Sequence, residues 1–226
     1  MIEKIISVAI DGPSGAGKST IAKSAARRFG LTYVDTGAIY RTVGIAAYRA
    51  GISPVDVHGI SGMLSKIRIE LRHDAGGQRM YLDGEDVTER LRDHEISRYA
   101  SDVSAIPQVR EFLLEMQRSL AREQSVIMDG RDIGTVVLPD ATLKVFLTAD
   151  MEERALRRHR ELCAVGSDIS YEQVLRDIES RDKNDSGRQA APLKAAEDSI
   201  LVDTTDITLK ESEELICALI AEKLGI

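Results

Sequence analysis

The chain has few cysteines and no pairing pattern among them. Only Cys163 and Cys217 occur in 226 residues, and no CxxC pair is present. Disulfide scaffolds and structural zinc sites depend on numerous or clustered cysteines, so the pattern favours two free thiols in a reducing compartment. A disulfide or a metal site remains the alternative. We therefore expect a cytoplasmic location.

The sequence also lacks an apolar run long enough to cross a membrane. Such a helix needs roughly 20 predominantly apolar residues. The apolar run at residues 5–10 is short and ends at Asp11. It follows Glu3 and has no cleavage-like site, so it is not typical of a signal peptide. We expect no membrane partner.

Positive charge is in deficit. Lysine and arginine number 30 against 37 aspartates and glutamates, which gives a formal net charge of −7. A general nucleic-acid binder needs a surplus of cationic side chains for phosphate contacts, so this class is disfavoured. Any basic site must be local.

The histidines suggest neither a metal site nor a catalytic base. The four of them, at positions 58, 73, 94 and 159, fall in no spacing typical of metal ligands. Whatever chemistry the chain performs, we expect it to depend on other side chains.

What the sequence does contain is enough apolar material for a core and a regular alternation of elements. Hydrophobic residues make up 43% of the chain, which excludes a wholly disordered protein. Short apolar runs typical of buried strands alternate with periodic stretches typical of helices, and Gly30 and Gly51 follow the first two helices. The expected strands are residues 5–10, 31–34, 125–128, 143–147 and 200–202, and the expected helices include residues 21–29, 38–50, 109–120 and 215–220. This alternation predicts a parallel sheet in a single three-layer α/β domain.

Residues 62–100 interrupt the alternation. Apolar and charged residues alternate over residues 67–72, which is typical of a half-exposed strand. Residues 80–82 and 85–87 flank Asp83-Gly84, a dipeptide that predicts a hairpin turn. We therefore expect a small antiparallel unit inserted in the α/β chain. Residues 184–192 are the one notable stretch that suggests a loop.

Residues 12–19 read GPSGAGKS and fit the pattern GxxxxGK[ST]. Glycines let the backbone N–H groups approach phosphate oxygens, and the helix that follows presents its positive end to them. The lysine of such a loop reaches the β- and γ-phosphates, and the hydroxyl after it ligates Mg²⁺. The expected ATP-binding residues are Gly12, Pro13, Ser14, Gly15, Ala16, Gly17, Lys18, Ser19 and Thr20.

The expected strand before residue 130 ends in Asp129, a carboxylate suited to holding Mg²⁺ together with Ser19. The alternative is that Asp129 only closes an Asx turn. Arg131 and Asp132 follow directly on the same loop. No NKxD sequence for guanine recognition is present, which argues against GTPases that use it.

Arginines form the second chemical pattern. Arg154, Arg157 and Arg158 are spaced to lie on one side of a helix, and Arg181 and Arg188 follow in a second charged segment. Alone, such runs are typical of a solvated helix surface. In a chain that also has a phosphate loop, the pattern favours a role for these arginines in neutralising the negative charge of the phosphates during transfer. Arg41 follows the second strand, where ligands bind in open α/β sheets, and is a candidate for the acceptor phosphate; the alternative is a surface arginine on a helix.

The sequence resembles one family closely, the bacterial-type cytidylate kinases. The matching segments span nearly the full chain: AIDGPSGAGKST at 9–20, VDTGAIYR at 34–41, MDGRDIGTVVLPDA at 128–141, ERALRRHREL at 153–162 and IESRDKNDSGRQAAPLKAAEDSILVDTT at 178–205. The resemblance implies a P-loop kinase fold. It also implies that residues 62–100 form a monophosphate-binding insert and that about residues 152–165 form a mobile lid.

The resemblance further implies roles for individual residues. Thr36, Arg41 and Arg131 would surround the CMP phosphate, Ser101, Arg110, Asp132 and Arg188 would read cytosine, and Arg181 and Asp185 would hold the ribose. Lys18, Arg131, Arg154, Arg157 and Arg158 would act in catalysis, and Ser19 and Asp129 would hold the metal. Ser101 and Arg110 rest on the resemblance alone.

The expected activity is transfer of the γ-phosphoryl group of ATP to CMP or dCMP, with Mg²⁺ as cofactor. The resemblance also suggests a monomer. One alternative is another small kinase of the same scaffold, acting on UMP, AMP, dTMP or shikimate. The other is a nucleotide-dependent switch, which predicts a partner surface in place of a second small-molecule site.

Overall fold

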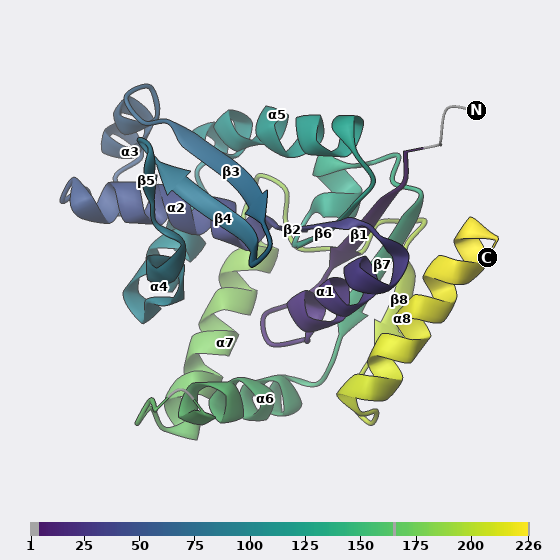
Figure 1. Cartoon of the computed structure of the whole chain (residues 1–226). Coiled ribbons are helices and arrows are strands. Elements are labelled where there is room, and N and C mark those ends of the chain that lie inside the picture. The colour runs from purple at the N-terminus through teal and green to yellow at the C-terminus, as the bar shows by residue number, and fades with distance from the viewer. Residues whose placement is uncertain (1–4, 165, 226) are drawn as a thin grey trace.

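Five parallel strands form the centre of the protein (Figure 1). The structure is a computed structural model and describes residues 5–164 and 166–225. The strands are β1 Ser7–Asp11, β2 Thr32–Asp35, β6 Val126–Gly130, β7 Leu143–Thr148 and β8 Ile200–Asp203. They lie in the order β2-β6-β1-β7-β8, and each neighbouring pair is parallel. The expected strands and the α/β class are confirmed.

Helices cover both faces of this sheet and connect its strands. The α-helices are α1 Lys18–Phe29, α2 Thr36–Arg49, α3 Val57–Leu64, α4 His94–Val103, α5 Pro107–Glu123, α6 Met151–Ala164, α7 Tyr171–Gly187 and α8 Leu209–Leu224. A 3₁₀ helix, η1, spans Thr88–Arg92, and a short π-helix, η2, spans Ile133–Val137. Gly30 ends α1 with a φ of 65° and donates its N–H to Ala26 O, as its position in the sequence predicts.

Strand β1 shows why three layers form. Val8 and Ile10 pack on one face of the sheet with α1 and α8, whereas Ala9 belongs to the apolar core on the other face with α2 and α5. Successive side chains of a strand point to opposite faces, so a continuous apolar run needs cover on both sides. The sheet is therefore buried between two helical layers, and its carboxyl-terminal edge is left for ligands.

The insert holds a second, antiparallel sheet that lies against α2 (Figure 1). Its strands are β3 Ile69–Asp74, β4 Gly77–Leu82 and β5 Glu85–Asp86, in that order. Asp83 and Gly84 connect β4 to β5 with φ values of 52° and 84°. Two left-handed residues in a two-residue connection are typical of a type I′ turn, so the predicted hairpin is confirmed.

Helices α6 and α7 form a hairpin of their own at the lower left of Figure 1. A small apolar cluster joins them, with Ala155, Val174 and Ile178 fully buried. The expectation of a loop at residues 184–192 is wrong in its first part, because α7 continues to Gly187. The helix persists there because Asp185 is buried in ion pairs with two arginines, and such contacts outweigh weak local helix propensity.

The proposed division of the chain into a kinase domain, an insert at 62–100 and a lid at 152–165 stays a prediction. Val165 lies outside the described residues, as do residues 1–4 and 226. Within the part of the chain that the structure describes, no helix combines the length and the apolarity that a membrane span requires.

Candidate active site

The phosphate loop lies between β1 and α1, and its glycines are required by the backbone path. Gly12 has a φ of 150°, and a Cβ atom there would lie 1.9 Å from the carbonyl oxygen of Leu147 on β7. Gly15 has a φ of 78° and also approaches the backbone of Arg154, with 2.9 Å from its ideal Cβ position to Arg154 O. The loop is therefore held against β7 and against the first turns of α6. Only glycine fits at these points.

Lys18 is the first residue of α1 and is buried. Its ammonium group donates to the carbonyl oxygen of Pro13 at 2.6 Å, so the side chain points back toward the phosphate loop. Burial, and then the positive charge of Arg131, lower the pKa of Lys18 to about 7. A cation in such a place is poised for an anionic ligand, which would restore its charged form.

Ser19 and Asp129 lie together at the carboxyl end of β6, as a metal site requires. Ser19 Oγ donates to Asp129 Oδ2 at 2.6 Å, and the hydroxyl of Tyr33 donates to Asp129 Oδ1 at 2.9 Å. Burial raises the pKa of Asp129, and the nearby charge of Asp35 adds to the increase. A bound cation would relieve this cost.

The donor set fits Mg²⁺. Hydroxyl and carboxylate oxygens are hard ligands of the kind it prefers. Among the described residues, no three carboxylate, imidazole or thiol side chains converge on one point. A nucleotide-bound Mg²⁺ takes one or two protein ligands and completes its shell with phosphate oxygens and water, and Ser19 and Asp129 would be two such ligands.

Thr36 and Arg41 lie on α2, whose first turn faces the same edge of the sheet. Asp35 is the N-cap of α2: its Oδ1 accepts from Ala38 N at 2.9 Å and its Oδ2 accepts from Arg41 Nη2 at 2.7 Å. Arg41 is therefore held at a helix N-terminus, where phosphate binding is favoured. The hydroxyl of Thr36 donates to Asp129 O at 2.7 Å, so contact with a phosphate as a donor requires this hydroxyl to turn.

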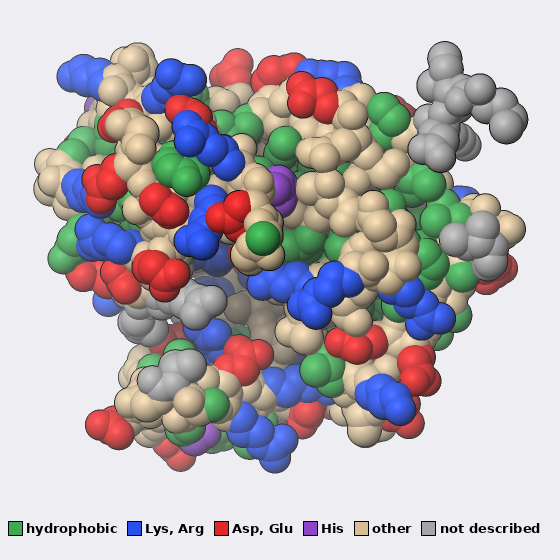
Figure 2. Space-filling view, viewed as in Figure 1, with side chains coloured by type: hydrophobic (Ala, Val, Ile, Leu, Met, Phe, Trp, Pro, Cys, Tyr) green, Lys and Arg blue, Asp and Glu red, His purple; other side chains and the backbone are tan. Residues whose placement is uncertain are grey.

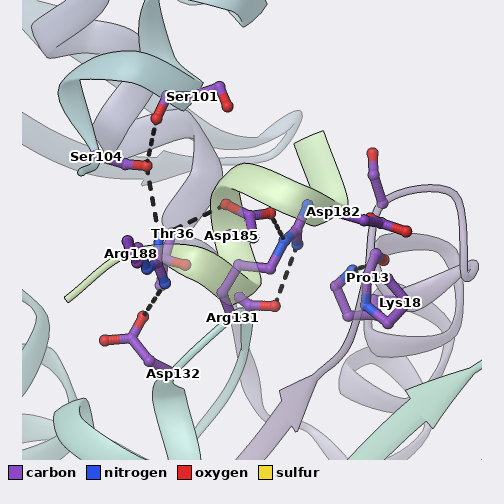
Figure 3. A network of polar contacts seen from close by, with 12 residues as sticks. Pro13, Lys18, Thr36, Ser101, Ser104, Arg131, Asp132, Asp182, Asp185 and Arg188 are labelled. Carbon is purple, nitrogen blue, oxygen red and sulfur yellow. Dashed lines mark hydrogen bonds and ion pairs between the residues drawn. The ribbon is translucent and has the colours of Figure 1, made fainter. Parts of the chain in front are cut away.

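Five charged side chains form a continuous series, shown in part in Figure 3, which we call the charge ladder. Its members, in spatial order, are Arg131, Asp185, Arg188, Asp132 and Arg110. Arg131 Nε donates to Asp185 Oδ2 at 2.7 Å, and Asp185 also pairs with Arg188 at 3.6 Å. Asp132 pairs with Arg188 at 3.7 Å and accepts a hydrogen bond from Arg110. The ladder joins the residues expected at the CMP phosphate, the ribose and the base.

Several polar atoms at this site are buried without a hydrogen-bond partner among the described residues. They include Ser101 Oγ, Arg188 Nη2 and Arg41 Nε. Buried polar groups are ordinarily satisfied, so such atoms need an explanation. All three belong to residues expected at the acceptor nucleotide. A pocket of about 280 Å³ opens beside Arg110 and Asp132, with Tyr40 and Leu114 among its lining residues.

The lid arginines contact separate partners. Arg154 is buried and donates to Ala149 O, to Ser14 O of the phosphate loop at 3.0 Å and to Asp182 at 2.7 Å. Arg157 pairs with Glu153 and also donates to Thr204, whereas Arg158 is half-buried and pairs with Glu161. The three do not converge on one point.

Arg181 lies on α7 near other cations. Burial, and then the charges of Arg158 and Arg131, lower its pKa. Burial and the charge of Arg110 likewise lower the pKa of Arg188. Figure 2 shows lysine and arginine side chains around a hollow between the α6–α7 hairpin and the rest of the molecule. The chain carries a net charge of −7, but cationic side chains gather around this hollow (Figure 2).

Some residues of the site were not identified from the sequence. Tyr33 binds Asp129, Asp35 binds Arg41, and Asp182 binds Arg154. Asp11, at the end of β1, accepts from the backbone N–H groups of Ile133 and Gly134 and so holds the segment that carries Asp132. Burial raises the pKa of Asp11 to about 6. For Asp11 and Asp35, the only indication in the sequence was a polar residue at the end of an expected strand. That position does not show which residue the carboxylate binds.

Comparison with known proteins places these features in a family. A sequence model of the family described as cytidylate kinase matches residues 8–222. A cytidylate kinase of Caldicellulosiruptor saccharolyticus is 49% identical over 222 residues, 98% of each chain. Those of Caldicellulosiruptor bescii and Caldanaerobacter subterraneus are 52% and 50% identical, over 92% and 96% of this chain and 92% and 95% of theirs.

One solved structure supports the fold independently. It is that of an uncharacterized protein from Eubacterium ventriosum, which is 13% identical to this chain. The two superpose with a TM-score of 0.55 over 97% of this chain and 99% of the other. At that identity the likeness concerns the α/β architecture alone.

Proposed function

Because the chain belongs to the cytidylate kinase family, we propose that it transfers the γ-phosphoryl group of ATP to CMP or dCMP, giving ADP and CDP or dCDP. The observation that carries the proposal is a group of cations at one edge of the sheet whose charged forms are disfavoured in the free protein. Lys18, Arg181 and Arg188 each have a lowered pKa because burial and neighbouring cations disfavour their charge. Two phosphate-bearing substrates would supply the missing negative charge.

ATP is proposed to bind along the phosphate loop. Residues 12–20 would surround its β- and γ-phosphates, with the backbone N–H groups that follow Pro13 as donors, and Lys18 would leave Pro13 O to contact them. Ser19 and Asp129 would hold Mg²⁺, which neutralises charge on the phosphates when bound. Arg154, Arg157 and Arg158 are proposed to complete this side from the lid. Which of them contacts the transferred group depends on lid position.

The acceptor phosphate is proposed to bind opposite, at Arg41, Arg131 and Thr36. One of its oxygens forms a bond to the γ-phosphorus while the bond from that phosphorus to the β,γ-bridging oxygen breaks, and ADP leaves with the bridging oxygen and its electron pair. The nucleophile is already anionic, so no strong base is needed. Positioning and charge neutralisation supply the catalysis.

The base is proposed to lie beside the charge ladder. Cytosine offers the N4 amino group as a donor, and the Asp132 carboxylate can only accept. Uracil presents an acceptor at the same position and would repel it. Ser101 Oγ and Arg188 Nη2, which have no hydrogen-bond partner among the described residues, would bind the remaining polar edge of cytosine, while Arg181 and Asp185 would hold the ribose.

A panel of acceptors tests the function. ADP release from ATP and Mg²⁺ is measured with CMP, dCMP, UMP, AMP, dTMP and shikimate in turn. CMP and dCMP should be the preferred acceptors. Preference for another acceptor, or slow ATP hydrolysis that no acceptor accelerates, would contradict the proposal.

We also propose that the enzyme acts as a monomer in the cytoplasm.

A further inference from the structure

Strand β2 is an outer strand of the central sheet, so half of its backbone groups have no strand to pair with. It pairs with β6 on one side only, with Thr32 opposite Val126 and Asp35 opposite Asp129. Backbone groups on an open edge must find other partners or water. In this protein the partners come from the insert.

Side chains of β3 and β4 occupy the open edge of β2. Gln78 Oε1 accepts from Asp35 N at 2.8 Å, and Gln78 Nε2 donates to Asp35 O at 3.0 Å. His73 Nε2 lies 2.9 Å from Tyr33 O. A glutamine amide that donates to and accepts from one residue makes the two bonds that a paired strand residue would make. Gln78 therefore fixes the backbone of Asp35 from the insert side.

The residue that Gln78 holds is the one that orients Arg41. Asp35 caps α2 through Ala38 N, and its second carboxylate oxygen pairs with Arg41 Nη2 at 2.7 Å. Arg41 Nε is buried and has no partner among the described residues. The contacts run without interruption from Gln78 to Asp35 to Arg41, and Arg41 still has a buried donor to offer a ligand.

We propose that Gln78 is a positioning residue for the acceptor phosphate. It acts through Asp35: by fixing the backbone at the α2 N-cap, it fixes the carboxylate that aims Arg41. This inference rests on the proposed function, since it takes Arg41 to be a ligand of the CMP phosphate. It assigns a role in the active site to a residue of the insert that does not contact the substrate.

The competing explanation is that Gln78 only stabilises the insert. Arg79, the next residue on β4, provides the matched control. Its side chain pairs with Asp74 and Asp86 within the insert, at 2.9 and 3.6 Å. Arg79→Ala should therefore change insert stability without changing KM for CMP.

Two variants of Gln78 separate hydrogen bonding from packing. Gln78→Ala removes both bonds to Asp35, and the isosteric Gln78→Glu keeps the size but loses the donor to Asp35 O. Each should raise KM for CMP about five- to ten-fold, the order expected for one or two neutral hydrogen bonds, and leave KM for ATP within about two-fold. Thermal unfolding of each variant is measured alongside, so that a loss of fold is seen directly.

A double-mutant cycle with Arg41→Ala decides whether Gln78 acts through Arg41. If it does, adding Gln78→Ala to Arg41→Ala should raise KM for CMP by less than about two-fold, because the side chain being aimed is gone. Additive effects, equal increases in KM for both substrates, or the same KM increase in Arg79→Ala would each overturn the proposal. Wild-type transfer to CMP is assayed in the same series. Its absence would refute the proposed function, whereas an additive cycle with an active wild type would refute only the role of Gln78.

Discussion

Lys18 combines deep burial with a position beside another cation. Burial and the charge of Arg131 lower its pKa to about 7 in the free protein. A nucleotide polyphosphate would place negative charge beside the ammonium group and raise this pKa again. At pH 8 the free side chain is mostly neutral and the bound one is charged. Binding should therefore take up a proton.

Calorimetry of ADP binding at pH 8, in buffers with different ionisation enthalpies, measures this uptake. The metal is chelated so that no cation binds at Asp129. We then expect an uptake of about one proton per nucleotide at pH 8, which falls as the pH is lowered through 7. Lys18→Ala is the control and should take up none. The same variant should lose phosphoryl transfer by about 10³-fold or more while remaining folded. Equal uptake in both proteins would mean that another group is responsible.

Asp132 is expected to select the base, and its neighbours determine how to test it. It pairs with Arg110 and Arg188, not with Arg131. Asp132→Ala would leave two buried guanidinium groups without this partner and so combine instability with altered recognition. Asp132→Asn keeps the shape, and its amide can donate to uracil O4.

We expect Asp132→Asn to narrow the ratio of kcat/KM for CMP over UMP by at least about ten-fold, the effect of losing one charge-assisted hydrogen bond. Part of the change should be an absolute gain with UMP. Rates for both substrates in wild type and variant provide the test. Losses in equal proportion would mean that Asp132 only orders its arginines.

At the scale of elements, the α6–α7 hairpin is fixed at one end. Arg154 ties the start of α6 to Ser14 and Ala149, whereas Arg158, in the middle of the helix, has a side chain that is 40% exposed. Neighbouring carboxylates pair with all three lid arginines, so mutual repulsion is not what would make the lid mobile. The distal half of α6 contacts the hairpin itself, through Leu162 and through His159, which lies 3.1 Å from Ile169 O, so it should move with the hairpin about the end that Arg154 holds.

Hydrogen exchange should reveal this difference within α6. A bisubstrate analogue should slow exchange at residues 158–164 much more than at residues 151–154, because closure orders the distal half over the phosphates. Helix α8 is the internal control and should not change. Uniform protection, or none, would indicate an ordinary surface helix.

The elements that the sequence predicts best are those with a local pattern. The strands, the phosphate loop and the Asp83-Gly84 hairpin each follow from apolar periodicity or turn chemistry within a few residues. The end of helix α7 could not be predicted in this way, because its last turn contains Asn184, Ser186 and Gly187, which are weak helix formers. It is held by Asp185 in the charge ladder, and pairing across 54 residues leaves no local pattern.

The same limit applies within the site. The phosphate loop and Asp129 could be predicted from motif and strand end, and the structure brings Ser19 to Asp129. Gln78 could not, because its function depends on which edge of the sheet the insert meets. A glutamine on a half-exposed strand has no distinguishing feature until that packing is known.

At the scale of the whole molecule, the surface includes apolar residues at the other edge of the sheet. Leu201 on β8 is 65% exposed and Leu209 at the start of α8 is 51% exposed. Single exposed leucines are common in monomers, so they do not require a partner. We expect light scattering to give the mass of one chain, with or without substrates. Leu201→Lys should have the same mass as the wild type. A wild-type mass of two chains that falls to one chain in this variant would contradict the monomer proposal.

The α6–α7 hairpin also limits how many independent movements the enzyme has. Its apolar cluster joins α6, which begins beside the phosphate loop, to α7, which carries Asp185 in its last turn. Helix α7 is unbroken over the roughly 20 Å from residue 171 to residue 185. A rotation of this pair over ATP must also displace the groups expected at the acceptor ribose. Closure over ATP and closure over the acceptor nucleotide are then one and the same movement. When the acceptor site is empty, the contacts with the acceptor that favour closure are missing. The hairpin would then stay open over ATP bound alone, and wasteful hydrolysis of that ATP would be avoided.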